Sequence, residues 1–269
     1  MTRRARLDAE LVRRGLARSR TQAAELVVAG RVLVDGLAAT KPATAVAPQT
    51  AVRLATPAGP GYASRGGHKL AGALDSLAAD GLTVSGRRCL DAGASTGGFT
   101  DVLLRRGARE VVAVDVGYGQ LAWNLRTDPR VTTFDRTNVR GLRPEAIGGP
   151  VAVAVADLSF ISLRLVLGAL IRCVRPDGDL LPLVKPQFEV GRARLGAGGV
   201  VRDAGLWRES VGRVADSAAE YGWGVAGVVR SPLPGPAGNV EFFLWLRRGA
   251  PAADPDALRA ATEPPAADR

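Results

Sequence analysis

The feature that most constrains the fold is a series of short apolar runs, each followed by a helix-like segment, that begins near residue 87. Four such runs are rich in valine, alanine and leucine: residues 87–93, 110–116, 151–158 and 179–186. Strands that are covered by helices on both faces read as continuous apolar runs, and repeated strand–helix units favour a parallel sheet. We therefore predict a doubly wound α/β domain.

The segments between and after these runs complete the prediction. Residues 99–107, 163–174 and 206–222 have helical patterns. The last two apolar runs, residues 223–230 and 240–248, are joined by SPLPGPAGN without a helix, so we expect them to form an antiparallel hairpin at the edge of the sheet. Residues 249–269 consist mainly of alanine, proline and acidic residues, and we expect a disordered tail.

The first sixty residues form a separate module in this interpretation. Leu7, Leu11 and Val12 mark one helix, and Ser19 begins a second that ends at Gly30. RVLVDG, residues 31–36, alternates like a strand and ends in a hairpin-type turn. A stretch rich in proline and glycine, TPAGPGY, follows at residues 56–62. We place the module at residues 1–60, a linker at 61–66 and the α/β domain at 67–248.

Positive charge is concentrated in this front module. The formal net charge of the chain is +10, and residues 1–31 hold eight arginines against three acidic residues, which is half of that excess. A basic surface indicates an anionic partner, and nucleic acid is favoured over membrane because no segment approaches the roughly 18 apolar residues of a spanning helix. Acidic residues interrupt the basic start, so we expect it to belong to the mature fold rather than to a targeting peptide. Its best candidates for phosphate contacts are Arg4, Arg6, Arg18 and Arg20.

Cysteine and histidine are rare. Cys89 lies in a strand-like run and Cys173 in a helix-like run, which predicts two buried thiols in a reducing cytoplasm. His68 is the single histidine, so we expect no metal site.

A glycine-rich loop follows the first strand of the predicted sheet. DAGASTGGFT, residues 91–100, opens a helix at the position where α/β proteins bind cofactors, and Gly93, Gly97 and Gly98 let the backbone approach a ligand. The loop lacks the G-x-G-x-x-G pattern of NAD and FAD sites. Asp115 ends the next strand, where a carboxylate can accept both hydroxyls of a ribose. Together the loop and this acid resemble the S-adenosylmethionine site of Rossmann-type methyltransferases.

Lysine is rare in this chain. The 36 basic residues include three lysines, Lys41, Lys69 and Lys185, and only an amine can be pushed by its surroundings toward losing its proton. Lys185 and Asp157 end apolar strands, Lys69 precedes the first one, and Glu241 opens the last. The chain has neither the Asn-Pro-Pro-aromatic signature of base-nitrogen methylation nor a cysteine for pyrimidine carbon, so we expect a hydroxyl acceptor.

The motifs together resemble the TlyA family of ribosomal RNA 2′-O-methyltransferases. An S4-like front module is followed by SRGGHKL, LDAGASTGGFTD, DVGYGQLAW, DLSFISL, LVKPQFE and SPLPGPAGNVEFFLW. The resemblance implies a seven-stranded FtsJ-type domain that uses S-adenosylmethionine to methylate the ribose of cytidine in 16S and 23S RNA, with ribosomal RNA and ribosomal subunits as partners. The implied catalytic set is Lys69, Asp157, Lys185 and Glu241. The expected cofactor-binding residues are Asp91, Gly93, Ser95, Thr96, Gly97, Gly98, Phe99, Asp115 and Val116, and Arg65 joins the expected RNA contacts.

Two questions stay open at this level. Lys185 can act as a base with a lowered pKa or as a cation that stabilises a developing alkoxide. Related linkers often carry a basic residue and a Trp before Ser-Arg-Gly, whereas this chain has Pro60, Gly61, Tyr62 and Ala63, so Tyr62 is the residue that can stack in place of the Trp.

Two other functions compete with this interpretation. Relatives are often labelled haemolysins, which suggests a membrane-active protein, but that function needs a spanning run, a secretion signal or an exposed amphipathic helix. The second is a ribosome-assembly factor that binds RNA and S-adenosylmethionine without catalysis. The complete four-residue set argues against it.

Overall fold

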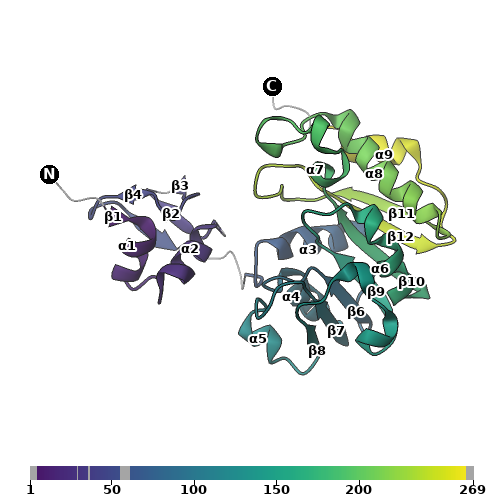
Figure 1. Cartoon of the computed structure of the whole chain (residues 1–269), viewed down its shortest axis with the longest axis horizontal. Coiled ribbons are helices and arrows are strands. Elements are labelled where there is room, and N and C mark those ends of the chain that lie inside the picture. Colours follow the sequence, from purple (N-terminus) through teal and green to yellow (C-terminus); the bar gives the residue numbers. More distant parts are fainter. Residues whose placement is uncertain (1–4, 29, 36, 55–60, 265–269) are drawn as a thin grey trace. The chain divides into compact units, whose positions relative to one another are not determined.

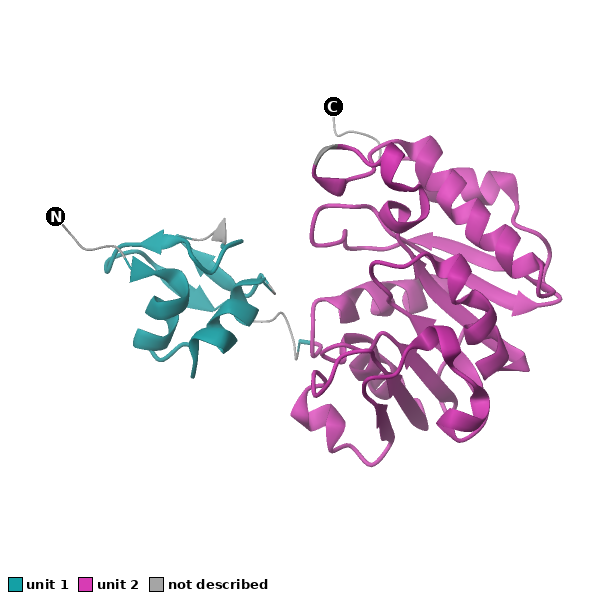
Figure 2. Ribbon diagram, in the orientation of Figure 1, with its two compact units in different colours: residues 1–61 teal, residues 62–269 magenta. Residues whose placement is uncertain are grey.

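The computed structural model describes residues 5–28, 30–35, 37–54 and 61–264, and the chain divides into two compact units at residue 61 (Figures 1 and 2). Unit 1 comprises residues 1–61 and unit 2 residues 62–269. Each unit buries a hydrophobic core of its own.

Unit 1 is a small α/β module, as the sequence predicted. Leu7 and Leu11 are fully buried in its core, and Ser19 caps the second helix by accepting a bond from the Gln22 amide at 3.1 Å. Its elements are β1 (Ala5–Arg6), α1 (Leu7–Arg13), α2 (Arg20–Val28), β2 (Val32–Val34), β3 (Leu37–Ala38), β4 (Ala45–Val46) and β5 (Val52–Leu54).

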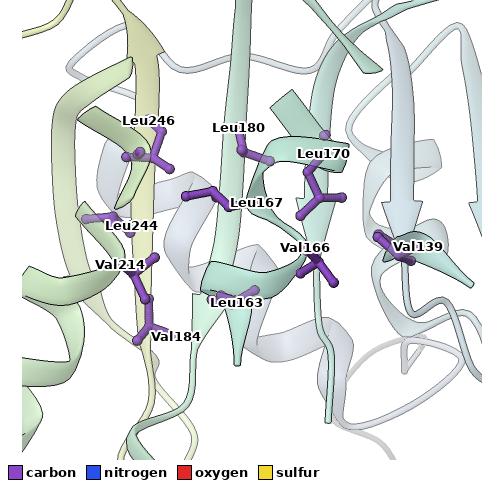
Figure 3. Close-up of a cluster of buried hydrophobic side chains, with 14 of the residues drawn as sticks. Val139, Leu163, Val166, Leu167, Leu170, Leu180, Val184, Val214, Leu244 and Leu246 are labelled. Atoms are coloured by element: carbon purple, nitrogen blue, oxygen red, sulfur yellow. The ribbon is translucent and has the colours of Figure 1, made fainter. Parts of the chain in front are cut away.

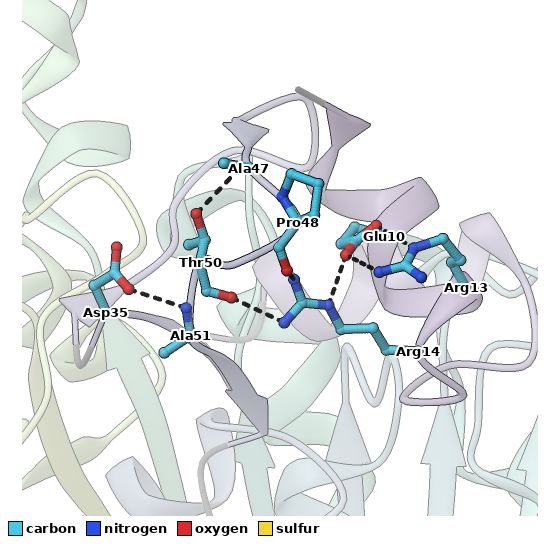
Figure 4. A network of polar contacts seen from close by, with 8 residues as sticks. All are labelled: Glu10, Arg13, Arg14, Asp35, Ala47, Pro48, Thr50 and Ala51. Atoms are coloured by element: carbon cyan, nitrogen blue, oxygen red, sulfur yellow. Dashed lines mark hydrogen bonds and ion pairs between the residues drawn. The ribbon is translucent and has the colours of Figure 1, made fainter. Parts of the chain in front are cut away.

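Glu10 and Arg14 form a polar network within unit 1 (Figure 4). Its carboxylate accepts bonds from Arg13 at 2.6 and 2.7 Å and from Arg14 at 2.7 Å. Arg14 also donates to the carbonyl groups of Thr50 and Pro48, each at 2.9 Å. Helix α1 is thereby fixed to the turn before β5, so this cluster supports the fold of the module.

Unit 2 contains a seven-stranded sheet in the order β11-β12-β10-β9-β6-β7-β8. Strands β6 to β10 are parallel, and β12 runs antiparallel to both of its neighbours. The strands are β6 (Arg88–Ala92), β7 (Glu110–Val114), β8 (Val131–Phe134), β9 (Val151–Ala156), β10 (Val174–Val184), β11 (Trp223–Arg230) and β12 (Phe242–Arg248). The predicted sheet with its antiparallel edge hairpin is confirmed.

Helices cover both faces of this sheet (Figure 1). The α-helices are α3 (Gly66–Leu77), α4 (Gly98–Arg105), α5 (Trp123–Arg126), α6 (Leu167–Cys173), α7 (Pro186–Glu189), α8 (Ala204–Ala219) and α9 (Pro255–Thr262). Short 3-10 helices are η1 (Val139–Gly141), η2 (Pro144–Ile147), η3 (Leu163–Leu165), η4 (Arg192–Arg194) and η5 (Ala197–Gly199).

Two core clusters lie on opposite sides of the sheet because successive strand residues point to opposite faces. Leu90 packs with Leu167 of α6 and Val214 of α8 in the first cluster, part of which Figure 3 shows. Its neighbour Cys89 packs with residues of α3 and α4 in the second. Both cysteines are buried, as predicted, and burial raises the pKa of the Cys89 thiol to about 12.

The chain returns from the β8 edge of the sheet to lay β9 beside β6. The order of the strands therefore reverses between β6 and β9, and α/β proteins bind ligands beyond the strand ends at such a point. The loops after β6 and β9 are in contact there, because a Cβ added at Gly93 would lie only 2.5 Å from the Asp157 carbonyl oxygen.

Several features of unit 2 differ from the prediction. Strand β8 and helix α5 were not predicted, since VTTF and WNLR are short and carry no clear periodicity. A disordered tail after Gly249 is wrong for residues 255–262, which form α9. Asp254 caps this helix and Pro255 begins it. Leu258 is buried in the core cluster that contains Leu90.

Candidate active site

The four residues of the predicted catalytic set lie at one edge of the sheet. Asp157 follows β9 and Lys185 follows β10 at their carboxyl ends, while Glu241 directly precedes the antiparallel β12. Val184 pairs with Phe242 across the ladder, which places Lys185 and Glu241 side by side at the rim. Lys69 reaches the same rim from α3.

Two ion pairs organise these side chains. Lys69 Nζ lies 2.6 Å from Glu241 Oε2, and Lys185 Nζ lies 2.6 Å from Asp157 Oδ1. Lys69 and Glu241 are 6% and 1% exposed, whereas the Asp157 side chain keeps 23% of its surface accessible. The first pair is therefore interior, whereas the second, whose Lys185 is also buried, is accessible through Asp157.

The N-terminus of α3 connects the two pairs. A Cβ added at Gly66 would lie 3.8 Å from Asp157 Oδ2, and Lys69 stands one turn further along the same helix. The structure thus brings together four residues that are remote in the chain, and Lys185 also donates to Ser159 Oγ at 3.0 Å. Ser159 was not among the predicted residues.

The glycine-rich loop adopts the strained backbone that its composition allows. Gly93, Ser95 and Gly97 have φ angles of +86°, +47° and +95°. The left-handed region strongly favours glycine, so glycine is required at positions 93 and 97. Ser95 is one of few non-glycine residues in the described chain that adopt a positive φ. The amide of Ser95 donates to Asp115 Oδ2 at 2.8 Å, which ties the loop to the end of β7.

Asp115 lies where a ribose-binding acid is expected. Its Oδ1 accepts a bond from the Gly117 amide at 2.7 Å, and the side chain stays partly exposed beside Ser95, Thr96 and Val116, which are themselves exposed. A carboxylate has about four acceptor positions, so two remain for a ligand.

Asp91 is the buried acid beneath this loop. Its Oδ2 accepts a bond from Thr100 Oγ1 at 2.7 Å, while Oδ1 has no hydrogen-bond partner within the described part of the chain. Burial raises the pKa of Asp91 to about 7, and the nearby carboxylates of Asp157 and Asp115 act in the same direction. A buried acceptor that lacks a protein donor fits a ligand that brings one, such as the α-amino group of S-adenosylmethionine.

Two of the predicted cofactor residues also make packing contacts. Phe99 is 4% exposed and its ring packs 5.9 Å from that of Phe243, so its side chain belongs to the core. Gly98 faces α3, because a Cβ there would lie 2.2 Å from Ser64 Oγ and 2.9 Å from the Gly67 amide. Both residues therefore pack the start of α4 against its neighbours, and any contact with a cofactor would be made by their backbone.

An exposed aromatic residue at the rim was missed by the sequence interpretation. Phe160 is 92% exposed and has a φ of +64°, a conformation that is unusual for a bulky side chain. Its ring lies 5.4 Å from that of Phe188, which in turn lies 6.0 Å from Lys185 Nζ. Strain of this kind concentrates at functional sites. Its position three residues after Asp157 was the available signal.

The predicted RNA-binding arginines differ in what they contact. Arg6 and Arg20 both donate to Asp8, and the Arg65 guanidinium donates to the Pro234 carbonyl at 2.6 Å. Arg18 is exposed. Arg4 lies outside the described residues.

Tyr62 packs within unit 2. Its ring meets His68 edge-on at 5.0 Å, and the Arg105 guanidinium lies 4.9 Å from its centre. These contacts occupy the ring, so the expectation that Tyr62 stacks in place of a linker Trp is not supported. The expected linker residues 62–66 are part of unit 2.

Comparison with known proteins agrees with this architecture. A model of the S4 domain matches residues 5–52, and the model of the FtsJ-like methyltransferase family matches residues 62–248. The chain is 65% identical over 247 residues to 16S/23S rRNA (cytidine-2′-O)-methyltransferase TlyA of Mycobacterium tuberculosis strain H37Rv, which covers 92% of this chain and 91% of the relative.

This chain belongs to the TlyA family of FtsJ-like methyltransferases. It is also 33% identical over 239 residues to Hemolysin A of Brachyspira hyodysenteriae, covering 88% of this chain and 98% of that one. A solved structure from Streptococcus thermophilus, named as a candidate hemolysin, superposes with a TM-score of 0.74 at 38% identity, covering 97% of this chain and 95% of that one. The family predicted from the motifs is therefore confirmed.

Within residues 5–28, 30–35, 37–54 and 61–264, no helix has the length and apolar character needed to span a membrane. Among the same residues, no three His, Cys, Asp or Glu side chains are grouped to hold a metal ion.

Proposed function

We propose that this chain methylates the ribose 2′-hydroxyl of cytidine in 16S and 23S ribosomal RNA with S-adenosylmethionine as the methyl donor. The observation that carries the proposal is the arrangement of Lys69, Asp157, Lys185 and Glu241 as two ion pairs at the sheet edge that also holds the glycine-rich loop. The name of the relative that is 65% identical supports the choice of acceptor and of both RNAs.

The cofactor would be held by the loop after β6. Asp115 offers free acceptor positions to ribose hydroxyls, and the unpartnered oxygen of Asp91 accepts from an ammonium group. When bound, S-adenosylmethionine supplies a methyl group that is activated by the adjacent sulfonium.

Lys185 acts on the acceptor hydroxyl. Its ammonium group, fixed by Asp157 at 2.6 Å and by Ser159 at 3.0 Å, stabilises negative charge that develops on the oxygen. The partly exposed carboxylate of Asp157 provides an acceptor for the hydroxyl proton. Lys69 and Glu241 form the inner pair that positions β12 and α3 behind this group. Holding the reactants in line can supply roughly 7 to 11 kcal/mol of the barrier.

Phe160 binds the base of the target nucleotide in this proposal. A base must leave its stack before an enzyme can hold the ribose in a pocket, and exposed aromatic rings stack on such bases. The ring of Phe160 is exposed, backed by Phe188, and stands beside Lys185. Unit 1 binds RNA phosphates through its arginines, which makes binding sensitive to salt.

Substitution of two lysines tests the chemistry. Lys185→Arg keeps the charge and should preserve RNA binding, yet methyl transfer should fall by about 10²-fold or more because the longer planar group displaces the contact with Asp157. Lys41→Arg is the matched control, since Lys41 is exposed and lies in unit 1. Methylation is measured by reverse-transcription mapping of both ribosomal RNAs.

The outcomes separate the competing functions. Near-normal methylation by Lys185→Arg would refute the role of this lysine. Ribosomal RNA that gains no 2′-O-methyl group from the unaltered chain, although it binds, indicates a non-catalytic assembly factor instead. Leakage of dye from lipid vesicles at the same protein concentration would favour membrane activity.

A further inference from the structure

Asp8 is a buried acidic residue that two arginines of unit 1 contact. Its carboxylate is 5% exposed and lies on the second residue of α1. Oδ1 accepts bonds from Arg6 Nε at 3.1 Å and from the Ala9 amide at 2.8 Å. Oδ2 accepts from Arg6 Nη2 at 2.9 Å and from Arg20 Nη2 at 3.0 Å. The acceptor positions of this carboxylate are therefore filled from inside the protein.

The two arginines that cover Asp8 remain open to solvent. The side chains of Arg6 and Arg20 are 54% and 60% exposed. Both Nη2 atoms contact the same oxygen, so they lie within about 6 Å of each other, a spacing set by the two cited bonds of 2.9 and 3.0 Å. Each guanidinium has five N–H donors and uses one or two on Asp8, which leaves the others for an anion.

This cluster differs from the neighbouring one around Glu10. There, Arg14 donates to the carbonyl groups of Thr50 and Pro48 and its side chain is only 21% exposed. Glu10, which pairs with Arg14, therefore stabilises the fold (Figure 4). Within the described residues, the guanidinium groups of Arg6 and Arg20 form hydrogen bonds with Asp8 alone. Their free donors point to a partner outside the protein.

We propose that Asp8 is a positioning residue for RNA binding, whose carboxylate holds Arg6 and Arg20 as a rigid pair of guanidinium groups for the phosphate backbone. This inference rests on the proposed function of the chain as an enzyme acting on ribosomal RNA. The hydrogen bonds from Arg6 also hold the pKa of Asp8 well below its usual range, which favours the charged form of the carboxylate.

Two opposing effects decide the outcome of removing this charge. A negative residue near RNA opposes binding, and its loss adds one unit of positive charge to the module. However, the carboxylate is covered by two cations, so little of its field reaches the RNA. Free arginines lose rotamer freedom when they bind, whereas a pair already fixed by Asp8 does not, and we expect this preorganisation to dominate.

The experiment compares two substitutions that each remove one negative charge from unit 1 of the full chain. Asp8→Asn keeps the acceptor for the Ala9 amide but loses the ionic hold on the arginines. Glu25→Gln is the matched control, since the Glu25 side chain is exposed and forms no hydrogen bond or ion pair with the described residues. We expect Asp8→Asn to weaken binding to a 16S ribosomal RNA fragment about three- to tenfold. Glu25→Gln should leave binding unchanged or tighten it.

A double-substitution background separates positioning from a merely structural role. In Arg6→Ala/Arg20→Ala, the further change Asp8→Asn should cause no loss of affinity, because the groups it positions are gone. Equal losses in both backgrounds would show that Asp8 acts on the fold and would overturn the proposal. So would Asp8→Asn binding as tightly as Glu25→Gln.

Two further measurements keep the test decisive. If thermal unfolding shows that Asp8→Asn does not fold, Asp8→Glu replaces it: the net charge is then unchanged, and weaker binding supports the proposal while wild-type affinity overturns it. Failure of the unaltered chain to bind the RNA above its affinity for a random RNA contradicts the proposed function itself. Binding and methylation by the unaltered chain with no effect of Asp8→Asn contradicts this inference alone.

Discussion

Lys69 Nζ and Glu241 Oε2 lie 2.6 Å apart although 172 residues separate them in the chain. The pair joins helix α3 to the start of β12, and both side chains are almost completely buried. A buried pair of this kind gives little net stability, but removing one partner is costly because it leaves a charge without compensation.

Glu241→Gln should therefore both destabilise unit 2 and impair catalysis. The glutamine carbonyl can still accept a bond from Lys69, so we expect a loss of about 1–3 kcal/mol in the free energy of unfolding, below the cost of full removal. Methylation should fall by about tenfold or more. Denaturant unfolding and methylation assays check both expectations.

Glu209→Gln is the control for that experiment. Glu209 pairs with Arg194 and Arg213 at 2.7 Å on the surface, where ion pairs contribute at most about 1 kcal/mol. If Glu241→Gln changes stability no more than Glu209→Gln does, the inner pair does not have the role described here.

The pKa of Asp91 predicts a dependence of stability on pH. The pKa is raised by burial from 3.8 to about 7, so the folded chain keeps a proton that the unfolded chain releases between these values. The contribution of this group to the free energy of unfolding is thus largest at and below about pH 4. It falls as the pH rises and becomes constant above about pH 7. The slope is at most about 1.4 kcal/mol per pH unit.

Asp91→Asn should remove this slope while keeping an acceptor for Thr100. We expect the unfolding free energy of the variant, measured without cofactor from pH 5 to 8, to vary less with pH than that of the unaltered chain. Parallel profiles for the two proteins would show that Asp91 is ionised in the folded chain throughout.

Phe160→Gly should separate strain from function. Glycine accepts a φ of +64° without cost, so we expect the variant to gain about 1 kcal/mol of stability. Loss of the stacking ring should lower kcat/KM for ribosomal RNA by about 10- to 100-fold, since base–aromatic stacking contributes about 1–3 kcal/mol.

Phe160→Trp provides the comparison, because it keeps an aromatic face at the same strained position. Its methylation rate should stay within about threefold of the unaltered chain, given that stacking tolerates different rings. A Phe160→Gly variant with unimpaired kcat/KM would mean that the exposed ring has no part in substrate binding.

The parts of the fold that were predictable from sequence are those with strong patterns. The runs before Asp157 (residues 151–156) and before Lys185 (residues 180–184) consist of apolar residues, so both the strands and the edge on which these residues lie could be predicted. Strand β8 could not, because its sequence VTTF is half polar and lies at the open edge of the sheet. Helix α9 was missed since its single buried leucine, Leu258, gives no periodicity, although Asp254 and Pro255 were a start signal.

The candidate site divides in the same way. Residue type and position placed the lysines and carboxylates at one rim, but which of them pair depends on side-chain geometry that no sequence pattern encodes. The glycines of the loop illustrate this limit: Gly93 and Gly98 were predicted from a ligand's approach, and the structure adds a close approach within the protein at each. Phe160 was missed because its exposure and its φ angle become visible only in three dimensions.

The insertion of β12 between β10 and β11 has a consequence for biosynthesis. Glu241 cannot reach Lys69 until this strand, the last in the chain, has been inserted between two strands that precede it in the sequence. Unit 1 has its own core and is translated first, so a growing polypeptide acquires its arginine-bearing surface long before it acquires a complete catalytic rim. Nascent chains halted before residue 242 would therefore carry the arginine-bearing surface of unit 1 without the complete catalytic rim.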